Sequence, residues 1–96
     1  MLERDFQARL IRELRDRYPL PDGIVMKVDP IQGLPDILIL YKNRWAALEV
    51  KRSATARHQP NQDYYVDIMN HMSFARFISP ENKEEVLHEL QQALEP

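Results

Sequence analysis

Two acidic residues and a lysine stand at the ends of two short apolar runs in the segment "GLPDILILYKNRWAALEVK", residues 33–51. Asp36 opens the first run, and Glu49 and Lys51 close the second. Carboxylate oxygens side by side suit Mg²⁺, which prefers hard oxygen ligands and keeps several of its waters. A neighbouring ammonium group can orient an attacking water and steady developing negative charge. Together these residue types could carry out metal-assisted hydrolysis of a phosphodiester.

The two runs bring these residues together if they pair as a β-hairpin. Side chains alternate between the two faces of a strand, so Glu49 and Lys51 emerge on the same face. Folding the chain about the tight turn at 42–44 places Asp36 opposite Val50. Because neighbouring strands lie about 4.8 Å apart, we expect Asp36 beside the Glu49–Lys51 segment. A register shift of one residue would change the partner but keep the cluster.

The motif letters alone are not specific. A second acid-x-lysine occurs at Glu81-Asn82-Lys83 and a second Pro-Asp at Pro21-Asp22. Neither lies on paired strands, because the first opens a predicted helix and the second sits in a turn. From geometry alone, the other interpretation stays open: an aspartate at a strand edge and a solvated Glu–Lys pair.

The elements that position these residues follow from apolar spacing and turn signals. Apolar residues every four positions predict a first helix that ends at "YPLPDG", and Gln62 to about His71 predicts a second helix. Ser79 is predicted to cap a last helix with Pro80 at its first position. Short strands are expected at 24–28, 36–41, 45–51 and 74–78. The order α-β-β-β-α-β-α predicts an α/β fold, a small mixed sheet flanked by helices.

Composition places the chain among globular proteins. Its 96 residues are 44% hydrophobic and 29% charged, which predicts a single domain over 1–96 without a membrane span. The absence of cysteine fits a cytoplasmic protein. A net charge of −2 argues against a passive DNA-coating protein. So small a core favours a homodimer that buries further surface.

The chain resembles the PD-(D/E)xK nucleases, most closely their small VRR-NUC branch. The resemblance extends from about Glu3 to Ile78, with motifs in the family's order and with family-like spacing. The matching stretches are "LERDFQ" with Glu3 and Gln7, "GLPDILIL" with Pro35 and Asp36, "ALEVK" with Glu49 and Lys51, and "NQDYYV" with Gln62 and Tyr65.

The resemblance implies a restriction-endonuclease-like core that cleaves DNA with Mg²⁺ or Mn²⁺. By analogy, Asp36, Glu49 and the carbonyl of Val50 hold the metal, and Lys51 is the catalytic lysine. Glu3 would reach the metal directly or through water. Gln62 would be a site residue that contacts the DNA backbone or the lysine.

Other roles stay open on the sequence. Glu3 is equally well explained as an exposed acid near a helix N-terminus. Arg52 and Arg57 follow the site directly and are candidates for phosphate contact, or they belong to an ordinary solvated loop. His58 has no metal-ligand spacing to the other histidines but could touch DNA from the same loop.

The expected function is a DNA endonuclease that cuts branched DNA such as a four-way junction, as stand-alone members of the branch resemble junction-cleaving dimers. One alternative is a nuclease with another preference: nicking, restriction or exonucleolytic. The other is a non-catalytic module that binds DNA or a protein on the same fold.

Overall fold

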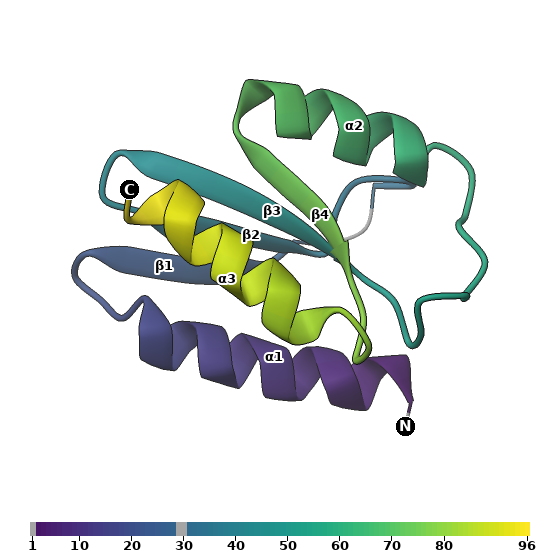
Figure 1. Cartoon of the computed structure of the whole chain (residues 1–96), viewed down its shortest axis with the longest axis horizontal. Coiled ribbons are helices and arrows are strands. Elements are labelled where there is room, and N and C mark those ends of the chain that lie inside the picture. The colour runs from purple at the N-terminus through teal and green to yellow at the C-terminus, as the bar shows by residue number, and fades with distance from the viewer. Residues whose placement is uncertain (1, 29–30) are drawn as a thin grey trace.

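The computed structural model describes residues 2–28 and 31–96. The elements follow in the order predicted from the sequence, α-β-β-β-α-β-α (Figure 1). The helices are α1 (Glu3–Arg17), α2 (Gln62–Met72) and α3 (Lys83–Leu94), and the strands are β1 (Gly23–Lys27), β2 (Ile37–Tyr41), β3 (Arg44–Val50) and β4 (Phe74–Ile78). No helix among the described residues is long and apolar enough to cross a membrane.

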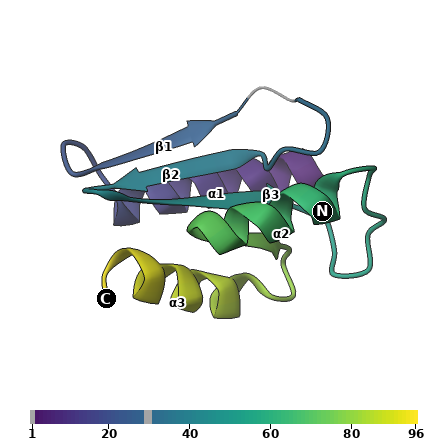
Figure 2. The same ribbon diagram turned by 90° about the horizontal axis from the view of Figure 1, so that it is seen from above.

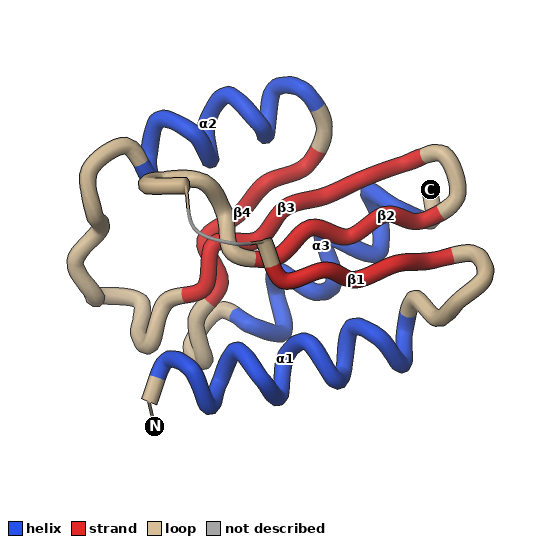
Figure 3. The backbone as a smooth tube through the Cα atoms, turned by 180° about the vertical axis from the view of Figure 1, so that it is seen from behind, coloured by secondary structure: helices blue, strands red, loops and turns tan. Residues whose placement is uncertain are grey.

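The four strands form one mixed sheet in the order β1-β2-β3-β4. The first three strands are a meander of antiparallel neighbours, and β4 runs parallel to β3. The parallel pair needs a crossover connection, and the loop after β3 together with α2 provides it (Figures 1 and 3). As a result, the C-terminal ends of β3 and β4 lie at the same end of the sheet as the start of β2.

The helices cover the two faces of the sheet unequally. A large apolar core joins residues of α1 and α3 to one face, and a smaller core joins α2 to the other face of β3 and β4. Alternation along β3 produces this division: Ala46, Leu48 and Val50 belong to the large core, while Ala47 and half-buried Trp45 pack in the small one. The predicted division of β3 between two faces is confirmed.

The predicted hairpin register was wrong by one residue. Ile37 pairs with Leu48, and Leu40 pairs with Trp45. The turn contains two residues, Lys42 and Asn43, because Lys42 adopts a left-handed backbone conformation with φ 56°. Such φ values allow the two-residue turns that match the strand twist.

The N-terminus of the last helix was also predicted wrongly. α3 begins at Lys83, and residues 80–82 form a turn instead of its first turn. Ser79 donates hydrogen bonds from its backbone N–H and its hydroxyl to Asn82 Oδ1, at 2.8 and 3.3 Å. The Asn82 amide in turn donates to Phe77 O. Because the Ser79 hydroxyl donates to Asn82 Oδ1, it does not serve as the N-cap acceptor of a helix that begins at Pro80.

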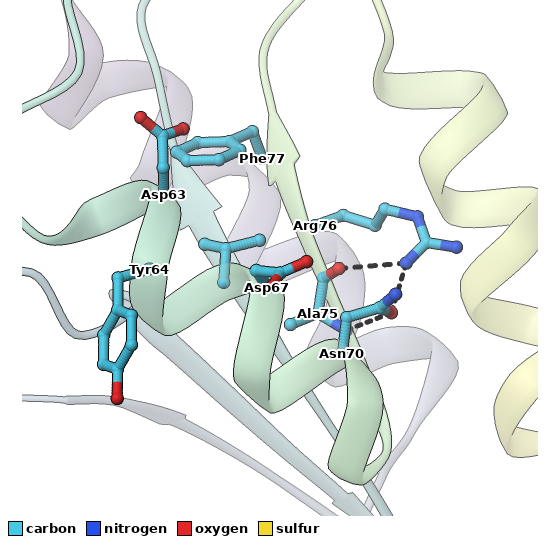
Figure 4. A pocket seen from close by; sticks show the side chains of 8 residues that line it. Asp63, Tyr64, Asp67, Asn70, Ala75, Arg76 and Phe77 are labelled. Carbon is cyan, nitrogen blue, oxygen red and sulfur yellow. Dashed lines mark hydrogen bonds between the residues drawn. The ribbon is translucent and has the colours of Figure 1, made fainter.

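Side chains satisfy backbone groups along both edges of the sheet. On β1, which lies at one margin of the molecule (Figure 2), the Arg15 guanidinium donates to Val25 O. On β4, Ala75 N donates to Asn70 Oδ1, and Arg76 donates to both Ala75 O and Asn70 Oδ1 (Figure 4). Occupied edge groups oppose the addition of a further strand.

Gly33 adopts a backbone conformation that fixes the loop leading into Asp36. Its φ is +93°, and a Cβ there would lie 2.7 Å from Asn61 Cβ and 3.0 Å from Tyr65 Cδ2. Gly33→Ala is therefore expected to lower the free energy of unfolding by about 1–3 kcal/mol, measured by urea denaturation. Gln32→Ala, at an exposed neighbouring position, serves as control. Equal stability of the two variants would contradict this role.

Candidate functional site

Asp36 is fixed between its two neighbouring strands at the start of β2. Its carboxylate Oδ2 accepts a hydrogen bond from Val50 N at 2.9 Å. Its backbone carbonyl accepts one from Val28 N, just after β1, at 2.8 Å. The register that pairs Ile37 with Leu48 brings Asp36 level with Glu49. The predicted proximity of Asp36 to the end of β3 is confirmed.

Glu49 and Lys51 are buried although both are ionisable. Glu49 is 3% exposed and Lys51 is 6% exposed. The backbone N–H of Lys51 donates to Ile78 O at 2.8 Å, which holds this residue against the end of β4. Because a buried charge without partners is costly, the interactions of these two side chains determine what the site can do. A solvated Glu–Lys pair is thus the wrong interpretation.

Gln62, the first residue of α2, connects the two buried side chains. Its Oε1 accepts a hydrogen bond from Lys51 Nζ at 2.6 Å, and its Nε2 donates to Glu49 Oε2 at 3.2 Å. Gln59 N also donates to Gln62 Oε1, at 2.8 Å. Lys51 Nζ has a second acceptor in the backbone carbonyl of Arg57, at 3.1 Å. The glutamine predicted as a site residue therefore contacts the lysine.

The second oxygen of Glu49 receives no N–H or O–H donor. Among the described residues, no such group donates a hydrogen bond to the buried Glu49 Oε1. Burial raises the pKa of Glu49 from 4.5 to about 9, helped by hydrogen bonding with Asp36 and by the negative charge of Asp36. Lys51 opposes this increase in pKa, and Glu3 adds to it. At neutral pH this carboxyl group is protonated unless a cation is supplied.

The donor set fits one hard divalent cation. Mg²⁺ is commonly held by one or two carboxylates with waters completing its shell, and Asp36 and unpartnered Glu49 Oε1 are such a pair. Within residues 2–28 and 31–96, no three His, Cys, Asp or Glu side chains are gathered in a metal-binding arrangement. Glu3 is exposed and lies outside any such group. The contact of Glu3 with the metal, directly or through water, and ligation by the Val50 carbonyl stay predictions.

The loop between β3 and α2 borders this site. Arg52 and Arg57 are exposed on it. His58 instead packs inward, stacked on the Phe77 ring with a centroid distance of 4.1 Å, and its Nδ1 lies 2.8 Å from Asp63 Oδ1. The two arginines are thus accessible to a ligand, while much of the histidine is engaged within the protein.

Sequence reasoning missed two contacts that hold this loop. Phe77 shares the α2 face of the sheet with Ala75 by strand alternation, a signal that could have identified it as the support of His58. The hydrogen bond from Ala54 N to Glu81 Oε1, at 3.0 Å, ties the loop to the turn before α3. No sequence signal predicts this second contact, because it joins two loops far apart in the chain.

A hollow with a volume of about 720 Å³ runs between α2 and β4, away from this site (Figure 4). Asp63, Asp67 and Arg76 line it, while Asp36, Glu49 and Lys51 do not. The residues proposed to carry the chemistry therefore do not face this hollow.

Comparison with known proteins adds no assignment to this geometry. No family model matches the chain, no curated protein is significantly similar to it, and no solved structure matches its fold.

The raised pKa of Glu49 predicts how stability depends on pH in the absence of divalent metal. The unfolded chain releases this proton near the usual pKa of 4.5, while the folded protein keeps it up to about pH 9. The free energy of unfolding contributed by Glu49 is therefore complete below about pH 4.5 and decreases as pH rises to about 9. The slope from this group reaches at most about 1.4 kcal/mol per pH unit.

Glu49→Gln replaces the neutral carboxyl group with a group that does not titrate. We expect this variant to lose the decrease between about pH 5 and pH 8, measured by urea denaturation in EDTA. Identical pH slopes in the parent and the variant would show that Glu49 is ionised in the folded protein.

Proposed function

We propose that the protein is a metal-dependent DNA endonuclease that hydrolyses phosphodiester bonds. The observation that carries this proposal is the buried Glu49 Oε1, which receives no N–H or O–H donor. It belongs to a carboxyl group that lies level with Asp36 and is connected to Lys51 through Gln62. A purely structural site would pair this oxygen, because an unsatisfied buried acceptor costs about 1–3 kcal/mol. The resemblance of "PD", "EVK" and the glutamine to the PD-(D/E)xK pattern favours the same activity.

In this proposal Asp36, Glu49 and the Val50 carbonyl hold Mg²⁺ or Mn²⁺. A bound cation would lower the pKa of a water ligand and stabilise charge on the phosphate. Asp36 keeps a fixed orientation, because its other oxygen accepts the hydrogen bond from Val50 N. Glu49 ligates as a carboxylate, so its proton must leave when the cation binds.

In this proposal Lys51 acts on the phosphate or on the attacking water. Its ammonium group donates to Gln62 Oε1 and to Arg57 O, and an ammonium group has three N–H donors. The remaining donor can bind a phosphate oxygen or the attacking water. The two acceptors hold Nζ in place, so that little side-chain freedom is lost when the substrate binds.

We infer that the active form is a homodimer. Ile24 and Met26 on β1 are 44% and 38% exposed, and Leu38 and Leu40 are half-buried on the same face of β2. α2 packs on β3 and β4, which leaves this apolar part of the sheet without a helix. Because side chains bind backbone groups at Val25 of β1 and Ala75 of β4, we expect a second copy to meet this face rather than add a strand.

A symmetric dimer would suit branched DNA, because its two equivalent sites can cut two strands symmetrically. Four-way junctions are therefore the substrate that we expect. Dependence of cutting on a free end or on a short duplex sequence would instead identify a nuclease with another preference.

Cleavage of a labelled four-way junction and of a matched linear duplex tests the activity. With Mg²⁺, the parent should cut the junction, and EDTA should abolish cutting. Asp36→Asn keeps an oxygen to accept from Val50 N but removes the charge, and Lys51→Ala removes the ammonium group. Each change should lower the rate by about a hundredfold or more, and the melting temperature of Asp36→Asn should stay within a few degrees of the parent.

A folded parent that cuts neither substrate with Mg²⁺ or Mn²⁺ would contradict the proposed activity. It would favour the non-catalytic binding module. Retained cutting by Asp36→Asn would place the active site elsewhere.

Light scattering at micromolar concentration tests the dimer. Ile24→Glu should convert a dimeric parent to a monomer, because the substitution places a charge in an apolar interface. Leu2→Glu, at an exposed apolar position that begins α1 on the other side of the sheet, should leave the dimer intact. A monomeric parent would contradict the inference.

A further inference from the structure

A cavity of about 280 Å³ lies in the seam between α1 and β1. Arg4, Arg15 and Lys27 contribute three cationic side chains to its lining, and Gln7 adds an amide. No acidic residue lines this cavity, and none of the three cations forms an ion pair with an acid among the described residues. In a chain with a net charge of −2, such a local concentration of positive charge favours an anionic ligand.

The cavity has donors held in place. Arg15 donates from Nε and Nη2 to Val25 O, at 3.4 and 3.2 Å, which fixes the guanidinium group while its remaining N–H groups stay available. The Nε2 atom of Gln7 is buried and has no hydrogen-bond partner. A tetrahedral anion with several oxygens can accept from both kinds of donor.

The seam adjoins the candidate active site. Lys27 pairs with Ile37, the residue after Asp36, and Asp36 O accepts from Val28 N. Arg4 follows Glu3, whose charge acts on Glu49. Figures 1 and 3 show the N-terminal end of α1 at the end of the sheet from which the loop after β3 leaves. An anion in the seam would therefore lie beside the site rather than in it.

We propose that the α1–β1 seam, defined by Arg4, Gln7, Arg15 and Lys27, binds a backbone phosphate of the DNA strand next to the bond that is cut. This inference rests on the proposed function. A phosphodiester suits the seam, because a strand whose scissile phosphate lies at Asp36 must extend past the metal site on both sides. The seam fixes the path of the strand on the α1 side, and exposed Arg52 and Arg57 flank the site on the loop side.

The test is the salt dependence of junction-DNA binding, measured by fluorescence anisotropy in EDTA so that nothing is cut. The seam variant is Arg4→Gln with Lys27→Gln, two exposed positions; Arg15 is left unchanged because it also caps β1. The control variant is Lys42→Gln with Arg44→Gln, which removes the same charge from the exposed hairpin turn at the opposite end of β2 and β3.

The seam variant should bind at least about tenfold more weakly than the control. Its plot of log affinity against log salt should be flatter by about one, as expected for the loss of one phosphate contact. Equal affinities and slopes in the two variants would overturn the proposal, because the seam would then act only through net charge. A parent that does not bind DNA in EDTA would overturn it as well.

Failure of the seam and failure of the nuclease proposal give different results. If the seam variant behaves like the control while the parent cleaves DNA, only the seam is refuted. If the seam variant loses affinity while the parent never cleaves, the seam is supported as a binding site and only the nuclease proposal is refuted.

Discussion

The burial of Glu49 next to Asp36 is the constraint on which this end of the sheet depends. Two carboxyl groups this close cannot both stay ionised in a dry environment without a cation. In the protein alone the repulsion between the two carboxylates is avoided by protonation of Glu49, whose pKa is raised to about 9. A bound divalent cation would instead allow both groups to ionise. The site therefore has two alternative states, one protonated and one metal-bound.

The residues around Glu49 and Asp36 do not neutralise the negative charge of these two carboxylates. Gln62 lies between Glu49 and Lys51 and contacts both, so the lysine does not neutralise the glutamate through a direct ion pair. Asp36 uses one oxygen for Val50 N and is therefore held at the glutamate. α2 begins at Gln62, so the packing of α2 on β3 and β4 positions the side chain that separates the charges.

Much of this arrangement could be predicted from local pattern. Strand alternation predicted that Glu49 and Lys51 emerge on one face at the end of β3, and hairpin pairing predicted Asp36 beside them. The one-residue error in register left Asp36 next to this segment. The error itself arose because nothing in "YKNRW" shows that Lys42 adopts a positive φ. The start of α3 was predicted wrongly because nothing in the local pattern shows that Ser79 donates two hydrogen bonds to Asn82 Oδ1 instead of capping a helix at Pro80.

The contacts that complete the site could not be predicted from local sequence pattern. Gln62 was identified only through a family resemblance, because its partners lie 11 and 13 residues away in the chain. The stacking of His58 on Phe77 depends on the path of the loop at residues 51–61, which shows no hydrophobic periodicity. The cationic seam lies between α1 and β1. Its charged residues are far apart in the sequence, so that only the fold shows that they line one cavity.

The measurement that tests the central claim most directly is the anomalous scattering of Mn²⁺ in crystals of the protein at pH 8. The account predicts one strong peak within coordination distance of an Asp36 oxygen and Glu49 Oε1, which disappears in Glu49→Gln crystals treated in the same way. A peak at another place, or none at saturating Mn²⁺, would show that the unpartnered oxygen of Glu49 does not form part of a metal site.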